Sequence, residues 1–353
     1  MLIILFLSCP TALAIADDGQ TDNKVYVYDN DGNFLIEKSG IEVGDEFLDD
    51  EFQKWEIYLI ENNTAIANKV KKINMPHVKI KNSSIKMTQN KKICLYMTHN
   101  DESYTPSDGY DSIYGAGGIH DVAKNLKSQL ENLGINVYID ETLHIPHNSS
   151  AYSRSKVTAT NLQNKYSPNG LFDIHRDGVA KSVYLSQNES GPLSKIRIVV
   201  GKGNPNYEEN YEFAKKIFSV GQALYPWLFL DIYSGKGTYN QNLQDHALLF
   251  EMGTYLIEKE YVLSSTPYLA NVLNTVLFDS QNEENGDIII DNDVINELEE
   301  DYENRNIFNE NIEKNDKKQE KSGILGLIFV IIAILGACSA SPIILILRKK
   351  NRP

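Results

Sequence analysis

The run ICLYMTH, residues 93–99, is a short apolar segment that ends on His99. The runs LFDIH, residues 171–175, and ALLFE, residues 247–251, repeat this pattern and end on His175 and Glu251. Short apolar runs of this kind are typical of buried β-strands. Since ligands in an open α/β sheet bind beyond the carboxyl ends of the strands, we expect two imidazoles and one carboxylate to meet at one edge of a sheet.

The segment around these runs, residues 91–279, alternates apolar strand patterns with helical ones. Strands are predicted at 135–139 and 196–201, and helices near 120–133, 152–166 and 207–224, with a last helix ending near 278. This β-then-α alternation is typical of a sheet whose faces are covered by helices. We therefore predict an α/β fold with a mostly parallel sheet.

Two histidines and a glutamate that is not a ligand are typical of a zinc hydrolase. Catalytic zinc usually has three protein ligands and one open position, so His99 and His175 leave one ligand to be found. We predict that His120 fills it, because it lies where a glycine-rich loop turns into a helix. Glu102, Asp108, Asp111, His144 and His147 are also candidates for this position.

Glu251 is predicted to be the general acid or base of the reaction. A glutamate at the end of an apolar strand is costly unless it is used or paired, and Arg176 or Lys236 could pair with it. Arg176 is also predicted to bind a substrate carboxylate or to orient a ligand. Further substrate contacts are predicted from Arg154 and Ser155 at a helix start, and from Asn240.

The regions on either side of this segment differ from it in composition. Residues 24–75 resemble a small β-rich module, with an Asp-Gly turn between two strands and no pattern typical of catalysis. Residues 76–90 are predicted to be a polar linker and residues 280–322 an acidic one. Between 279 and 321 there are 15 Asp or Glu and 5 Lys or Arg, so −10 of the chain's formal −14 lies there. We expect no nucleic-acid partner, since such partners favour basic surfaces.

Both ends of the chain have patterns of membrane targeting. Residues 1–14 combine an apolar run with an A-x-A cleavage pattern and are predicted to be a secretory signal. Residues 323–347 are long and apolar enough to span a bilayer as a helix. A basic tail, residues 348–353, follows and is expected in the cytoplasm. The sequence therefore predicts a single-pass protein of the cell membrane whose catalytic domain lies outside the cytoplasm.

Seven blocks between residues 92 and 275 resemble the stage II sporulation protein P family and follow its order. They are YMTHNDESYTP (96–106), YSRS (152–155), FDIHRDG (172–178), VVG (199–201), YP (225–226), YNQNL (239–243) and LLFEMG (248–253). The sequence departs from many relatives at Trp227, where Gly is common, and at Tyr110 to Tyr114, where relatives carry a histidine.

This resemblance implies an amidase 3-like fold and a zinc-dependent N-acetylmuramoyl-L-alanine amidase over residues 91–279. Such an enzyme cuts the amide bond between muramic acid and the stem peptide of peptidoglycan. The resemblance also implies cross-link endopeptidase activity and a lytic transglycosylase partner similar to stage II sporulation protein D, during engulfment. Two different functions also fit the pattern: a wall-binding scaffold without catalysis, and a wall carboxypeptidase or deacetylase.

Overall fold

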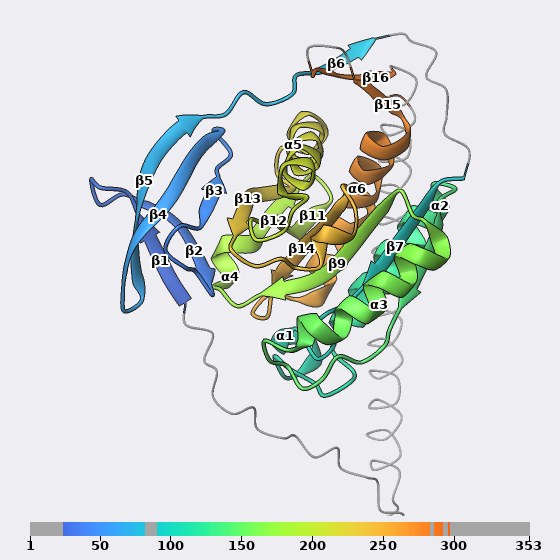
Figure 1. Ribbon diagram of the computed structural model, residues 1–353, viewed down its shortest axis with the longest axis horizontal. Helices are drawn as coiled ribbons and strands as arrows, with labels where there is room; N and C mark the ends of the chain where they lie inside the picture. The colour runs from blue at the N-terminus through green and yellow to red at the C-terminus, as the bar shows by residue number, and fades with distance from the viewer. Residues whose placement is uncertain (1–23, 82–89, 283–285, 292–295, 297–353) are drawn as a thin grey trace, which may run out of the picture. The chain divides into compact units, whose positions relative to one another are not determined.

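The three apolar runs form neighbouring parallel strands of one sheet. The computed structural model describes residues 24–81, 90–282, 286–291 and 296 (Figure 1). The order of the six central strands is β13-β12-β14-β9-β7-β8, and all neighbours are parallel except β12 and β14. Their bounds are β7 (Lys92–Tyr96), β8 (Asn136–Asp140), β9 (Gly170–Asp177), β12 (Ile196–Gly201), β13 (Phe229–Gly235) and β14 (Ala247–Thr254).

Helices cover both faces of this central sheet, because its strands are apolar on both sides. On β9, Phe172 packs on Phe213 of α5, while its neighbour Leu171 packs with Ala159 and Leu162 of α3. Helix α6 packs against both α2 and α5, and α3 contacts β7 and β8. The helices are α1 (Thr105–Asp108), α2 (Ile119–Asn132), α3 (Ala151–Tyr166), α4 (Lys181–Tyr184), α5 (Tyr207–Leu224) and α6 (Lys259–Phe278), with a 3-10 turn, η1, at Gln241–Leu243.

The N-terminal strands continue the same sheet. Strand β3 (Glu46–Leu48) pairs with β13, which gives an eleven-stranded sheet that ends in β2-β1-β5-β4-β3. The remaining bounds are β1 (Lys24–Tyr28), β2 (Phe34–Ser39), β4 (Gln53–Glu61) and β5 (Thr64–Lys72). Buried side chains of these strands share one apolar cluster with Val199, Tyr233 and Leu249 of the central sheet. The N-terminal strands therefore pack over a face of the central sheet.

The prediction of a mostly parallel sheet was wrong, because the sheet is mixed. The hairpins of the N-terminal strands and their junction at β3 are antiparallel, and β14 runs antiparallel to β12. Short connections can join only antiparallel strands, so the brief turns between residues 24 and 72 impose this geometry. The β-then-α alternation correctly indicated parallel pairing for four pairs of strands. These are β8 with β7, β7 with β9, β9 with β14, and β12 with β13.

Smaller elements lie in the segments predicted to be linkers. Strand β6 (Val78–Lys81) pairs with β16 (Ile288–Asp291), which pairs with β15 (Ser280–Asn282). The apolar run Ile288-Ile289-Ile290 explains why an otherwise acidic segment forms a strand. A hairpin of β10 (Leu185–Asn188) and β11 (Gly191–Ser194) completes the elements.

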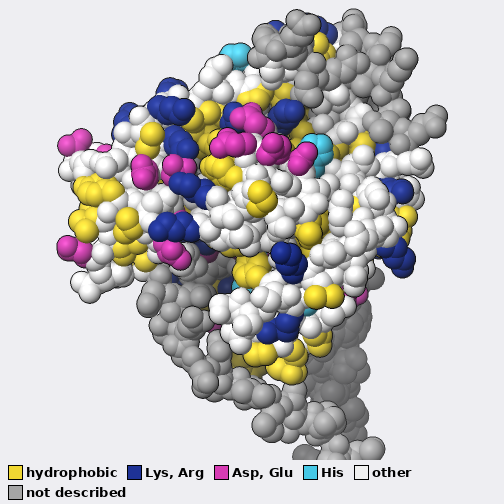
Figure 2. Space-filling view, in the orientation of Figure 1, with side chains coloured by type: hydrophobic (Ala, Val, Ile, Leu, Met, Phe, Trp, Pro, Cys, Tyr) yellow, Lys and Arg dark blue, Asp and Glu magenta, His cyan; other side chains and the backbone are white. Residues whose placement is uncertain are grey.

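Several predicted segments lie wholly outside the described residues: the signal at 1–14, the span at 323–347 and the basic tail at 348–353. No helix among the described residues is long and apolar enough to cross a membrane. On the face drawn in Figure 2, the acidic and basic side chains of the described residues are interspersed. This agrees with the composition, which concentrates the negative charge beyond residue 279.

Candidate active site

A row of charged side chains crosses three neighbouring strands at the end of the central sheet. In the sheet register Arg197 lies opposite Glu251, and Glu251 lies opposite His175. Residues that are paired in register point to the same face of a sheet. The register therefore places an arginine, a glutamate and a histidine side by side on one face.

The loop after β7 brings His99 and Glu102 to this row. Glu102 Oε1 lies 3.2 Å from His99 Nδ1 and 3.3 Å from His175 Nδ1. The two imidazole rings meet edge to face with centroids 4.9 Å apart. The other oxygen of Glu102 accepts a hydrogen bond from the backbone N–H of Arg176 at 3.0 Å. Glu102 thus links both histidines, although His99 follows β7 and His175 lies on β9.

Close packing of the backbone fixes Glu102. A Cβ at Gly117 would clash with the carbonyl oxygen of Glu102 and with backbone atoms of Asn100 and Asp101. The N–H of Gly117 also donates to the carbonyl of Asn100. The glycine-rich loop, which was expected to position His120, holds Glu102 as well: the backbone N–H of His120 donates to the carbonyl of the same Gly117 at 3.1 Å.

Glu102 and Asp173 give the group a negatively charged surrounding. Glu102 is buried, which opposes its charge, yet His175, His99 and Arg176 hold its pKa well below the usual range. Burial likewise opposes charge on His175, but the Asp173 and Glu102 carboxylates outweigh it and raise its pKa. Asp173 Oδ1 lies 3.0 Å from His175 Nε2, on the far side of the ring from Glu102. A carboxylate behind a histidine is a common way to orient a metal ligand.

The spacing of these atoms fits a divalent metal. Zinc bonds of about 2.0–2.1 Å in a tetrahedron place the ligand atoms about 3.3 Å apart. The separations of Glu102 Oε1 from the two Nδ1 atoms, 3.2 and 3.3 Å, agree with that value. His147 is also near, since the ligand atoms of His99, Glu102 and His147 all lie within 4.8 Å of one another. We prefer His99, His175 and Glu102 as ligands, because a carboxylate backs His175 while its Nδ1 faces Glu102.

His120 contacts a carboxylate on another segment, and its role as the third ligand stays a prediction. Its Nδ1 lies 3.0 Å from Glu141 Oε1, and its buried Nε2 has no hydrogen-bond partner among the described residues. Glu102 and His147, which the sequence also offered as ligands, do lie at the site, and the His147 ring stacks on His99 with centroids 3.8 Å apart.

His144, Asp108 and Asp111 are engaged elsewhere and do not join the metal-ligand group. His144 is held between the Met97 carbonyl and the Thr158 hydroxyl. Asp108 accepts from Lys259 and from the N–H of Tyr104. Asp111 offers its backbone carbonyl, not its carboxylate, to Arg176.

Glu251 is buried, and its charged partner comes from the N-terminal strands. Its Oε1 lies 3.6 Å from Lys38 Nζ, and its Oε2 is buried without a hydrogen-bond partner among the described residues. Burial raises the pKa of Glu251 to about 7, although Lys38 opposes the shift. Lys236, which the sequence suggested as a partner, instead lies 3.8 Å from Glu42. Sequence reasoning missed Lys38 because nothing in residues 24–75 resembles a catalytic motif.

The predicted substrate-binding residues divide into two groups. Arg176 lies at the site, where its Nη2 donates to the Asp111 carbonyl at 3.0 Å. Ser155 and Asn240 are buried and bonded to each other at 2.9 Å. Arg154 Nε donates to the His144 carbonyl at 2.8 Å. The last three therefore hold loops behind the site, and their role in substrate binding stays a prediction.

The sequence model of the stage II sporulation protein P family matches residues 27–274. The chain belongs to this family. The match begins within β1 and ends within α6, so it includes the N-terminal strands as well as the site residues. Stage II sporulation protein P of Bacillus subtilis strain 168 is 27% identical over 209 residues, which are 54% of this chain and 52% of that protein. The chain thus spans about half the length of this curated relative.

Two solved amidase structures are similar to the chain. The CwlD amidase of Clostridioides difficile, in complex with the GerS lipoprotein, has a TM-score of 0.36 and 12% identity, and the match covers 53% of this chain and 95% of CwlD. An N-acetylmuramoyl-L-alanine amidase of Clostridium difficile 630 has a TM-score of 0.36 and 13% identity. The match covers 54% of this chain and 98% of that protein. Membership of the family rests on the sequence match.

Proposed function

We propose that this protein is a zinc-dependent peptidoglycan hydrolase that cuts the N-acetylmuramoyl-L-alanine amide bond during sporulation. The observation that carries the proposal is the placement of Glu251. Glu251 lies on the strand next to that of His175, and its Oε2 has no hydrogen-bond partner among the described residues. Glu102 links His175 to His99. A metal-ligand group beside a buried carboxyl group is an arrangement that supports metal-assisted amide hydrolysis.

The residues of the site would have separate roles in such a reaction. His99, His175 and Glu102 would hold the metal, and Asp173 would keep the His175 ring in orientation. Zinc, when bound, supplies a Lewis acid that polarises the scissile carbonyl and makes water more acidic.

Glu251 Oε2 can accept the proton of the attacking water and return it to the amine nitrogen that leaves. Its pKa of about 7 suits both steps near neutral pH, because the group is then neither always charged nor always neutral.

Mass spectrometry of digested sacculi tests the proposal. Wild-type protein should release intact stem peptides, and Glu251→Gln should release about 10² to 10⁴ times less while still binding the sacculi. Glu258→Gln is a matched control, since that carboxylate pairs with Lys181 away from the site. The control should cut at the wild-type rate.

The products separate this function from the different ones that the sequence pattern also fits. Loss of a terminal D-Ala would indicate a carboxypeptidase, and released acetate a deacetylase. Binding without any product would indicate a scaffold, whereas cleavage within cross-links would add endopeptidase activity to the amidase.

We further propose, from the sequence, a location outside the cytoplasm at the cell membrane, with residues 323–347 as the anchor. Protease added to intact protoplasts should then degrade the catalytic domain and leave the anchor. A lytic transglycosylase similar to stage II sporulation protein D is the proposed partner, and co-purification from sporulating cells tests it.

A further inference from the structure

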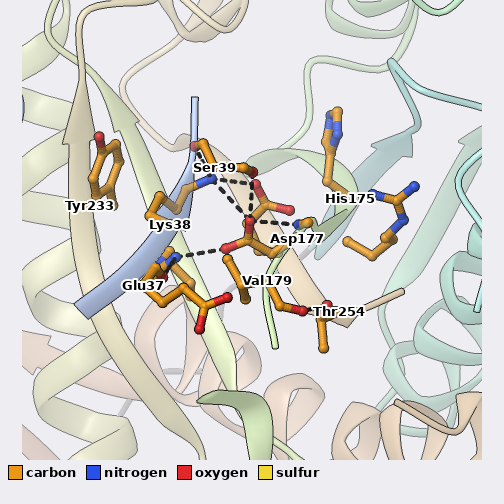
Figure 3. A network of polar contacts seen from close by, with 12 residues as sticks. Glu37, Lys38, Ser39, His175, Asp177, Val179, Tyr233 and Thr254 are labelled. Carbon is orange, nitrogen blue, oxygen red and sulfur yellow. Dashed lines mark hydrogen bonds and ion pairs between the residues drawn. The ribbon is translucent and has the colours of Figure 1, made fainter. Parts of the chain in front are cut away.

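Lys38 contacts the site from strand β2, at the far end of the eleven-stranded sheet. In the order of strands, β2 is separated from β14 by six others, yet Lys38 Nζ lies 3.6 Å from Glu251 Oε1. The contact arises because the N-terminal strands pack over a face of the central sheet, where they share an apolar cluster with Leu249 of β14. Figure 3 shows Lys38 pointing from its strand toward Asp177.

The ammonium group of Lys38 is held on several sides. Its Nζ lies 3.3 Å from Asp177 Oδ1 and 3.3 Å from the carbonyl oxygen of Ser39, in addition to Glu251 Oε1. The Tyr233 ring lies below it, with 5.6 Å between Nζ and the centroid. An ammonium group has three N–H donors, and three oxygens surround this one. Lys38 is therefore directed at protein groups and not at a substrate.

Asp177, the anchor of Lys38, is itself fixed by other residues. It accepts hydrogen bonds from Arg197 at 2.6 Å, from the Tyr184 hydroxyl at 2.9 Å and from the N–H of Gly178 at 2.8 Å. Arg197 is fully buried and is held in turn by Asp231. Lys38 thus joins a rigid buried network to Glu251, whose Oε2 has no hydrogen-bond partner in the described part of the chain.

We infer that Lys38 is a positioning residue for the proposed reaction: it holds one oxygen of Glu251 so that the other is presented to the reacting groups. The inference rests on the proposed function, because it assigns Glu251 to proton transfer. It also assigns a role in catalysis to the N-terminal strands, whose β2 completes the site.

Kinetics on a soluble muropeptide test this role. Lys38→Met keeps the length of the side chain and removes its charge, and it should lower kcat about 10²-fold with little change in KM, since a misplaced catalytic group costs about that much. Lys38→Arg should recover only part of the lost kcat. It restores the positive charge, but a planar guanidinium cannot reproduce the contacts of a compact ammonium group.

Lys54→Met is the matched control. It removes a lysine that pairs with Glu46 at 2.7 Å on the same N-terminal strands, and it should keep the wild-type kcat. Equal kcat values for Lys38→Met and the control would overturn the inference.

A double-mutant cycle shows whether Lys38 acts through Glu251. In the Glu251→Gln background, Lys38→Met should lower kcat no further, since the group that it positions is already lost. An equal further loss would overturn the inference, because Lys38 would then act by another route. Should Lys38→Met fail to fold, Lys38→Gln, which keeps a donor for Asp177, serves the same cycle.

Thermal unfolding of the four proteins of this cycle gives a measurement that needs no activity. They are the wild type, Lys38→Met, Glu251→Gln and the double variant. Lys38→Met should lower the Tm more in the wild type than in the Glu251→Gln background, because only the wild type leaves the Glu251 charge without its partner. Additive shifts in Tm would show that the two side chains are not coupled and would overturn the inference. If the wild type releases no product from wall material, the proposed function fails, while the Tm values still decide whether Lys38 holds Glu251.

Discussion

Replacing Arg197 by methionine should strongly destabilise the fold. The Arg197 side chain is fully buried and binds both oxygens of Asp231, at 2.7 and 2.9 Å, and Asp177 at 2.6 Å. Asp177 would keep Lys38 and Tyr184 as partners, whereas Asp231 would be left buried without its guanidinium. Removing one partner of a buried ion pair costs about 3–5 kcal/mol. At about 2–4 °C per kcal/mol for a domain of this size, Tm should fall by about 6–20 °C.

Urea unfolding followed by circular dichroism measures this effect. The double variant Arg197→Met with Asp231→Leu should be more stable than the single variant, because it leaves no unpaired charge at position 231. A single variant within about 1 kcal/mol of the wild type would refute the reasoning, since it would mean that water or other groups solvate Asp231. A double variant less stable than the single one would refute it too.

Three further predictions concern the metal-ligand group. Glu102→Gln should abolish the binding of zinc measured by inductively coupled plasma mass spectrometry, whereas His120→Gln should keep it, and the reverse result would make His120 the third ligand. Asp173→Asn should weaken zinc binding about 10- to 100-fold in a competition titration, because it removes the carboxylate behind His175; unchanged affinity would contradict this. Gly117→Ala should lower the free energy of unfolding by about 1–3 kcal/mol, because its Cβ would clash with the Glu102 backbone, and urea unfolding should show the loss.

The central strands could be predicted from local patterns in the sequence. So could the place where their functional side chains meet. Apolar runs that end on His99, His175 and Glu251 indicated three strands, and the structure makes β7, β9 and β14 parallel neighbours. This worked because burial on both faces demands a continuous apolar run, which is visible in a single segment of sequence. His175 and Glu251, which end two of these runs, lie near the carboxyl ends of β9 and β14.

The partners of these residues could not be predicted in the same way. Glu102 lies three residues after His99, and its role depends on how the loop turns, which Gly117 decides from further along the chain. Lys38 reaches Glu251 only because the N-terminal strands pack over the central sheet. A contact between two segments that are distant in sequence produces no recognisable pattern in the sequence of either segment. The place of His120 at a helix start favours a ligand role, but the contact of its ring with Glu141 could not be predicted from the sequence.

The pairing of β3 with β13 has a consequence for how the chain folds. Phe47 on β3 meets Tyr233 on β13, so the N-terminal strands are made long before the strand that joins them to the rest. Such distant pairings close large loops, which slows folding. Until β13 is in place, the outer edge of β3 presents unpaired backbone groups that could bind another chain. During synthesis β3 therefore stays unpaired until β13 has been made. A chaperone that binds this edge in the meantime should raise the yield of folded protein.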